Sequence, residues 1–307
     1  YGENYMKLIL GTVGSPNTKY EDLEKIFDTV YDHYGKETII DTGHGYMKRD
    51  DENNAETYIG RWIKERGLTP EKDIKVIDKV GLWYNENKDG ERKIQDPSEI
   101  LDEIYQRLGF MPETILIHAL KDSKTISDER YLELAQLIED TADIKESGFS
   151  AHMEFEPLIM WLQKLKEFSK QKYAMLPYSV LSDIPNIWHD EQGKHFSQNK
   201  NIYGVDAWPN CTKEGFKVAK DLGYETIIMM PREQGKITQI SHAPLWQNWC
   251  FRYACINEYA DYIAESSLNP AHIKEDIAIA EGEWYHPTNR EGLRDKIIAE
   301  SEELGNW

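Results

Sequence analysis

Short apolar runs alternate along the chain with longer segments in which apolar residues recur every three or four positions. The first run, LILG at residues 8–11, has the length and composition of a buried β-strand, and residues 20–34 follow with the spacing of an amphipathic helix. The same order of strand and helix recurs downstream. One later helix start is well marked, because Asp96 can cap an N-terminus and Pro97 suits the first helical turn.

Eight such pairs can be placed along the sequence. Strands are predicted at residues 8–11, 38–41, 74–80, 114–119, 144–150, 173–180, 225–230 and 261–266. Helices are predicted at residues 20–34, 54–66, 97–108, 129–138, 157–170, 212–222, 244–256 and 270–280. This count, without a low-complexity linker, favours a (β/α)8 TIM barrel that forms a single domain over residues 1–307. A long loop is expected at about 182–211, after the sixth strand, and an extra C-terminal helix at about 288–304.

Charge and composition narrow the classes of function. The chain carries 55 acidic and 36 basic residues, a formal charge of −19, which disfavours binding to nucleic acid. No apolar run approaches the roughly 20 residues that cross a bilayer, and the first residues lack the pattern of a secretion signal. Three cysteines without metal-ligand spacing suit a reducing compartment. We therefore expect a cytoplasmic protein that does not bind membranes.

Polar residues stand at the carboxyl ends of three successive predicted strands, where barrel enzymes carry their chemistry. Asp41 ends the second strand, Lys79 lies in the third and His118 in the fourth, and Tyr46 follows Asp41 by five residues. A buried lysine needs a carboxylate, which Asp41 can supply. A lysine cation would lower the pKa of Tyr46 from about 10, so that Tyr46 could act as a general acid. His118 could then orient a carbonyl oxygen while a hydride arrives.

Each of these residues taken alone also has an ordinary structural explanation, such as a turn residue or a satisfied core histidine. Their joint pattern on successive strand ends favours a catalytic function, and the surrounding motifs resemble those of a known family. IIDTGHGY at 39–46, NAETYIG at 54–60 and LGTV at 10–13 are similar to motifs of the aldo-keto reductase superfamily, as are IDKVG around Lys79 and ILIHA around His118. The chain resembles a divergent member. The resemblance implies an NAD(P)H-dependent oxidoreductase that reversibly reduces an aldehyde or ketone, a sugar included, with Tyr46 as proton donor beside Asp41, Lys79 and His118.

The resemblance also implies where the nicotinamide cofactor binds. The matching positions are Gly11, Thr12, Ser150, Met175, Met229, Pro231, Arg232, Ser266, His272 and Asp276. Three ring contacts depart from the family pattern, because Ala151, Met175 and Met229 stand where an asparagine, a glutamine and a tyrosine are usual. The carboxylate of Glu265 would repel a 2′-phosphate. NAD(H) is therefore slightly favoured over NADP(H).

The substrate is expected at the barrel mouth, against His44, Trp83 and Trp188. Aromatic residues at this rim suit either a small carbonyl or sugar substrate or a subunit interface, so a homo-oligomer remains open. His44 and His118 lack a carboxylate at ligand spacing, and no metal site is predicted. Two alternatives to a reductase also remain open. One is a barrel of this shape that acts as a binding or regulatory subunit, and the other is a sugar isomerase or lyase.

Overall fold

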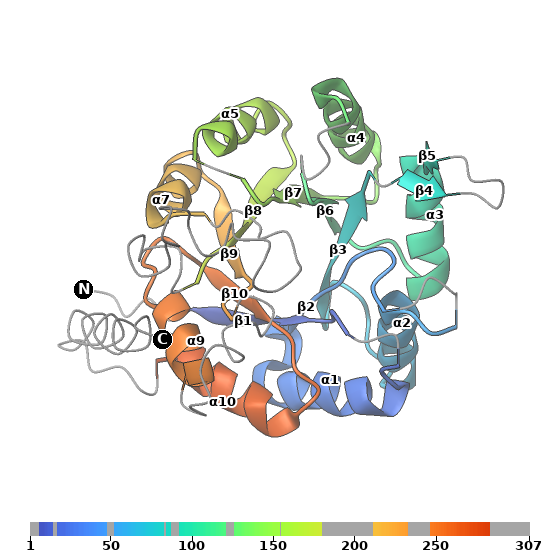
Figure 1. Ribbon diagram of the computed structural model, residues 1–307. Helices are drawn as coiled ribbons and strands as arrows, with labels where there is room; N and C mark the ends of the chain where they lie inside the picture. Colours follow the sequence, from blue (N-terminus) through green and yellow to red (C-terminus); the bar gives the residue numbers. More distant parts are fainter. Residues whose placement is uncertain are drawn as a thin grey trace.

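The computed structural model describes residues 6–14, 17–47, 52–82, 84–86, 92–120, 126–153, 155–179, 211–232 and 246–282. The strands of its central sheet are β1 (Lys7–Gly11), β2 (Ile39–Asp41), β3 (Lys75–Gly81), β6 (Thr114–His118), β7 (Glu146–Ser150), β8 (Gln171–Pro177), β9 (Glu225–Met229) and β10 (Tyr262–Glu265). They close a parallel barrel in the order β1-β10-β9-β8-β7-β6-β3-β2. Figure 1 shows this barrel at the centre of the molecule.

Helices form the outer ring of the barrel in Figure 1. The described helices are α1 (Tyr20–Tyr34), α2 (Ala55–Glu65), α3 (Pro97–Leu108), α4 (Asp128–Asp140), α5 (Phe155–Leu165), α7 (Lys213–Asp221), α9 (Trp246–Cys255) and α10 (Pro270–Ala280). The (β/α)8 fold predicted from the sequence is confirmed. The predicted starts of two helices are also found, since the side chain of Asp96 caps α3 and that of Asn54 caps α2.

Three of the described elements were not predicted. A short antiparallel hairpin, β4 (Tyr84–Glu86) with β5 (Arg92–Ile94), lies beside α3, and a single 3₁₀ turn, Gly35–Glu37, follows α1. The strands of the hairpin are three residues each and largely polar, so no apolar alternation reveals them. One predicted helix is shorter than expected: α5 ends at Leu165 instead of residue 170. The chain turns there because Phe168 donates its N–H to the Leu165 carbonyl before β8 begins.

Apolar residues fill two layers. The inner layer lies within the barrel and contains Ile9, Ile39, Ile77, Leu116, Tyr173, Met175 and Ile227. The outer layer lies between the strands and the helices, with residues such as Val76, Ile115 and Trp62 fully buried. Neighbours in sequence therefore face opposite sides of the barrel wall, as Val76 and Ile77 do, which is the alternation that a strand imposes.

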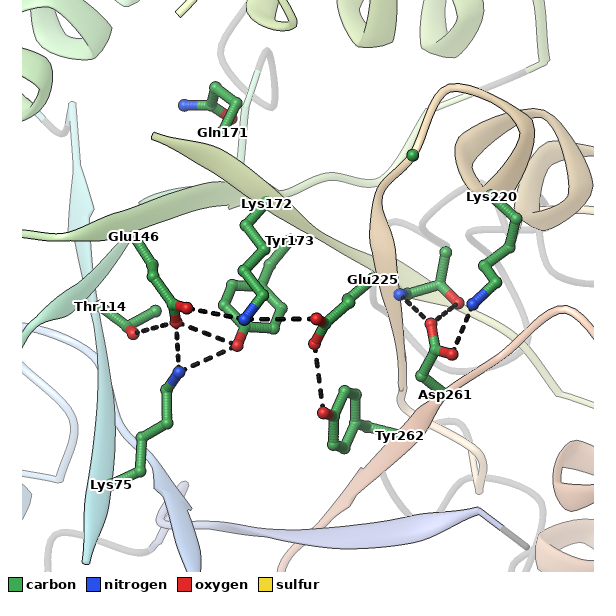
Figure 2. A network of polar contacts seen from close by, with 12 residues as sticks. Lys75, Thr114, Glu146, Gln171, Lys172, Tyr173, Lys220, Glu225, Asp261 and Tyr262 are labelled. Carbon is green, nitrogen blue, oxygen red and sulfur yellow. Dashed lines mark hydrogen bonds and ion pairs between the residues drawn. The ribbon is translucent and has the colours of Figure 1, made fainter. Parts of the chain in front are cut away.

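Charged residues close the end of the barrel at which the strands begin (Figure 2). Glu146 of β7 accepts bonds from Lys75 of β3 and from Lys172 of β8, the second at 2.6 Å. Lys172 also pairs with Glu225 of β9 at 3.2 Å. Although burial alone would raise it, these two lysines lower the pKa of Glu146 to about 2. Ion pairs thus link the strands at one end of the barrel, opposite to the end where the chemistry is expected.

Some predictions concern residues outside the described part of the chain. They are the loop at about 182–211, of which only Cys211 is described, the helix at about 288–304, and the substrate residues Trp83 and Trp188. Among the described helices, none is both long and apolar enough to cross a membrane.

Candidate active site

Residues at or near the carboxyl ends of three strands lie at one end of the barrel. Asp41 ends β2, and Lys79 lies near the end of β3, the strand paired with it. The ammonium of Lys79 is 2.5 Å from Asp41 Oδ1, and the Lys79 side chain is only 1% exposed. Burial alone would lower the pKa of Lys79, but Asp41 outweighs that effect and raises it. Lys79 is therefore a fixed positive charge inside the barrel mouth.

The ring of Tyr46 lies beside that charge. Lys79 Nζ is 5.1 Å from the centre of the Tyr46 ring, and the Tyr46 hydroxyl is 3.3 Å from His118 Nε2 at the end of β6. Gly43 leaves the space that this arrangement needs, because a Cβ there would approach the Tyr46 ring to 3.0 Å and His118 to 3.3 Å. The structure thus brings together the four residues that the sequence proposed as catalytic.

The pKa of Tyr46 departs from the expectation. Burial raises it above its ordinary value, while the nearby Lys79 ammonium opposes the rise without overcoming it. The predicted lowering was wrong because it counted the cation and not the loss of solvent around the phenol. Tyr46 is consequently protonated throughout the neutral range, as a proton donor must be.

Two histidines at this end of the barrel, His118 and His152, are held neutral. Burial, and after it the charge of Lys79, moves the pKa of His118 well below its ordinary value. His152, two residues past the end of β7, was not singled out from the sequence, and burial lowers its pKa to about 4. A charge on His152 would further disfavour charge on His118. The signal that could have found it is its place in GFSAH, just beyond a strand end.

Backbone strain concentrates at the same end. Of the four described non-glycine residues with positive φ, three follow directly after a predicted site residue: Met47 at 71°, Ala119 at 51° and Met230 at 57°. Such conformations cost of order 1–3 kcal/mol and persist only where surrounding contacts enforce them. One of those contacts is visible, since the Ala119 N–H donates to Ser150 Oγ at 3.0 Å. The loop after His118 is therefore fixed by the neighbouring strand.

Residues expected to hold the nicotinamide half of a cofactor lie on both sides of this group. Thr12 donates its hydroxyl to the Asp41 carbonyl at 3.1 Å, directly after Gly11. Ser150 accepts the bond from Ala119, and no acceptor for its own hydroxyl proton is found among the described residues. Met175 belongs to the apolar layer inside the barrel, and the partly buried Met229 packs against that layer. Ser150 and the two methionines thus offer a ligand one hydroxyl group and an apolar surface.

A separate polar cavity of about 170 Å³ lies where β10 leads into α10. It is lined by Arg232, Asn248, Glu265, Ser266, Ser267, His272, Glu275 and Asp276. Arg232 follows the buried Pro231 and forms ion pairs with Glu265 at 2.7 Å and with Asp276 at 2.6 Å. Burial raises the pKa of Glu265 to about 7, although Arg232 opposes the rise. The predicted cofactor-binding residues Arg232, Ser266, His272 and Asp276 therefore share one cavity.

His44, a predicted substrate residue, has a side-chain partner of its own. Its Nε2 is bonded to Glu103 Oε2 of α3 at 2.8 Å, so the ring is already held by the outer helix. The sequence did not single out Glu103, because nothing in its local pattern distinguishes it from a surface glutamate. Among the described residues, no three His, Cys, Asp or Glu side chains gather as ligands of a metal ion.

No family model matches the sequence, and no curated protein matches it. Solved structures do match the fold. An aldo-keto reductase from Bacillus halodurans in its holo form superposes with a TM-score of 0.63 at 16% identity, over 94% of this chain and 91% of that one. An aldo-keto reductase from Klebsiella pneumoniae in complex with NADPH gives 0.62 at 13% identity, over 95% and 90%. The same type of enzyme from that organism, with NADP and acetate, gives 0.61 at 14% identity, over 95% and 91%. The chain thus has the (β/α)8 barrel fold of the aldo-keto reductases.

Proposed function

We propose that the protein is a nicotinamide-dependent oxidoreductase of the aldo-keto reductase type that reversibly reduces an aldehyde or ketone. The observation that carries the proposal is the Tyr46 hydroxyl, held 3.3 Å from His118 and beside the buried ammonium of Lys79. The barrel fold shared with reductases, two of which are described with NADP or NADPH, supports it.

The roles of the side chains follow from their charges. A bound nicotinamide would supply the hydride. His118 is neutral and donates a hydrogen bond that holds the substrate oxygen next to Tyr46. As negative charge develops on that oxygen, Tyr46 gives it the phenolic proton. Lys79 stabilises the phenolate that remains, and Asp41 keeps Lys79 in place.

The cavity beside α10 fits the adenosine end of a dinucleotide. Its wall combines hydroxyl, amide and carboxylate groups, which suit ribose hydroxyls. Among the described residues of this wall the cation is Arg232, which Glu265 and Asp276 already neutralise, so a 2′-phosphate there would meet carboxyl groups. This favours NAD(H), in contrast to the NADPH of the Klebsiella pneumoniae structure. Glu265→Lys combined with His272→Arg should shift preference toward NADP(H), and an unchanged preference would contradict this assignment of the cavity.

The function is tested first by binding and then by turnover. The nine tryptophans should report binding when NADH or NADPH is titrated while fluorescence is followed. Oxidation of the bound cofactor should then depend on an added aldehyde, and Tyr46→Phe should abolish this oxidation while it leaves the binding curve unchanged. Binding without turnover of any aldehyde, ketone or sugar would favour the regulatory-subunit alternative. No response to either cofactor would remove the reductase proposal.

A further inference from the structure

Tyr46 stands on a short turn between β2 and α2, and the position of this turn decides where its hydroxyl lies. The backbone of His44 donates to the Lys79 carbonyl at 3.0 Å, so the chain keeps following β3 beyond the end of β2. The Tyr46 N–H then closes a turn onto the Gly43 carbonyl at 3.0 Å. Backbone contacts thus fix the side of the turn against β3, and a longer one joins the turn to the start of α2, where the Ala55 N–H donates to the Tyr46 carbonyl at 3.4 Å.

The outer side of the turn is held by a side chain. The His44 ring is bonded to Glu103 Oε2 at 2.8 Å, and its side chain is 12% exposed. Because α3 is packed against β3 and α2, this bond joins the Tyr46 turn to a rigid element of the outer ring. Glu56 of α2 is also close enough for its charge to interact with His44.

Glu103 is itself fixed from two sides. Its Oε1 accepts from Gln95 at 2.8 Å, and its Oε2 pairs with Arg107 at 3.1 Å. Arg107, 7% exposed, reaches on to the fully buried Glu56 of α2 at 3.0 Å. Charges therefore alternate from the buried Glu56 through Arg107 to Glu103, which is 35% exposed and bonds to His44 of the Tyr46 turn. Charge-assisted bonds of this kind are short and directional, which suits them to hold a loop in one place.

We propose that Glu103 and His44 are positioning residues for the reaction, which hold the Tyr46 turn so that the phenol keeps its distance to His118. The inference rests on the proposed function, and neither residue touches the reacting atoms. A displacement of about 1 Å at a catalytic group can cost on the order of 100-fold in rate. Loss of the bond should accordingly lower kcat by roughly 10- to 100-fold.

A double-mutant cycle tests the coupling between these two residues. Glu103→Ala and His44→Ala should each lower kcat, while the dissociation constant of the cofactor stays unchanged. The double variant should be no slower than the slower single one, because both changes remove the same bond. Single variants with wild-type kcat, or losses that multiply in the double variant, would overturn the inference.

Two further variants separate positioning from general damage. Glu103→Gln keeps the volume and an acceptor for His44, so it should fold and recover a large part of the kcat lost in Glu103→Ala. If Glu103→Ala does not fold, Glu103→Gln alone decides, and it should show a lower kcat than wild type at an unchanged cofactor affinity. The matched control is Glu133→Ala, which breaks the exposed pair with Arg130 on α4 and should leave kcat unchanged.

One measurement does not depend on enzymatic activity. In crystal structures of the wild type and of His44→Ala, the distance from Tyr46 Oη to His118 Nε2 should lengthen from 3.3 Å in the variant. An unchanged distance would overturn the positioning role even in an active enzyme. A lengthened distance in a protein without reductase activity would instead retain the positioning role and reject the proposed function.

Discussion

Replacement of the buried ion pair between Lys79 and Asp41 tests the electrostatic basis of the site. Both side chains are nearly inaccessible, at 1% and 7% exposure. Removing one partner of such a pair leaves an uncompensated buried charge, which costs about 3–5 kcal/mol of stability. We therefore expect Lys79→Met and Asp41→Leu each to lower the free energy of unfolding by about that amount near neutral pH.

The double variant should behave differently from the sum of its parts. Apolar side chains of similar size at both positions remove the charges together, and such replacements are often neutral or stabilising. Two independent losses would add up to about 6–10 kcal/mol. We expect instead that Lys79→Met with Asp41→Leu unfolds within about 2 kcal/mol of the wild type. It should have no carbonyl reductase activity, because no cation remains to stabilise the Tyr46 phenolate.

Urea unfolding followed by tryptophan fluorescence measures these differences, with equal slopes required for the comparison. The pH dependence gives an internal check. The pKa of Lys79 is raised in the folded state, so its contribution is complete below its ordinary pKa of about 10.5 and is lost as pH rises through the folded value. Each single variant should therefore show its full loss of stability at neutral pH. Additive losses in the double variant would refute the reasoning.

Three other outcomes follow from the structure. Glu146→Gln should lower the free energy of unfolding by about 2–3 kcal/mol at neutral pH, since the pKa of Glu146 lies at about 2. Because this pKa is depressed, the stabilisation is present above the ordinary pKa of the group and disappears as pH falls through about 2, so the stabilities of the two proteins should converge in acid. Gly60→Ala should destabilise the protein by roughly 1–3 kcal/mol or more in thermal unfolding, because a Cβ would lie 2.4 Å from the Leu108 carbonyl oxygen. Unaltered stability would show that α2 and α3 can separate freely. Because the pKa of Tyr46 is raised, kcat for reduction should stay level between about pH 6 and pH 9, and a fall centred near pH 7 would disagree with a protonated phenol.

The sequence was informative where one residue type could satisfy one physical need. Strand and helix periodicity, with caps such as Asp96, predicted the barrel and most element bounds. A lysine within an apolar strand needed a carboxylate, and the neighbouring strand offered Asp41, so their contact could be anticipated. The position of Tyr46 five residues after Asp41 placed the phenol near both.

Other features depended on distances that a sequence does not contain. The direction of the Tyr46 pKa is a balance between burial and one cation, and only the packed structure shows that burial prevails. His44 bonds to Glu103, 59 residues further along the chain, because α3 packs beside the turn. Likewise, Arg232 meets Glu265 and Asp276 only after β9, β10 and α10 have come together.

We propose that a nicotinamide bound to this barrel would supply a hydride to a carbonyl carbon while Tyr46 protonates the carbonyl oxygen. Incubation of the protein with an aldehyde and a nicotinamide cofactor that carries deuterium at the transferable position, followed by mass spectrometry of the alcohol, tests this claim directly. We expect one deuterium on the carbinol carbon with the wild type and none above background with Tyr46→Phe. Unlabelled alcohol, no alcohol at all, or equal labelling by both proteins would contradict the claim.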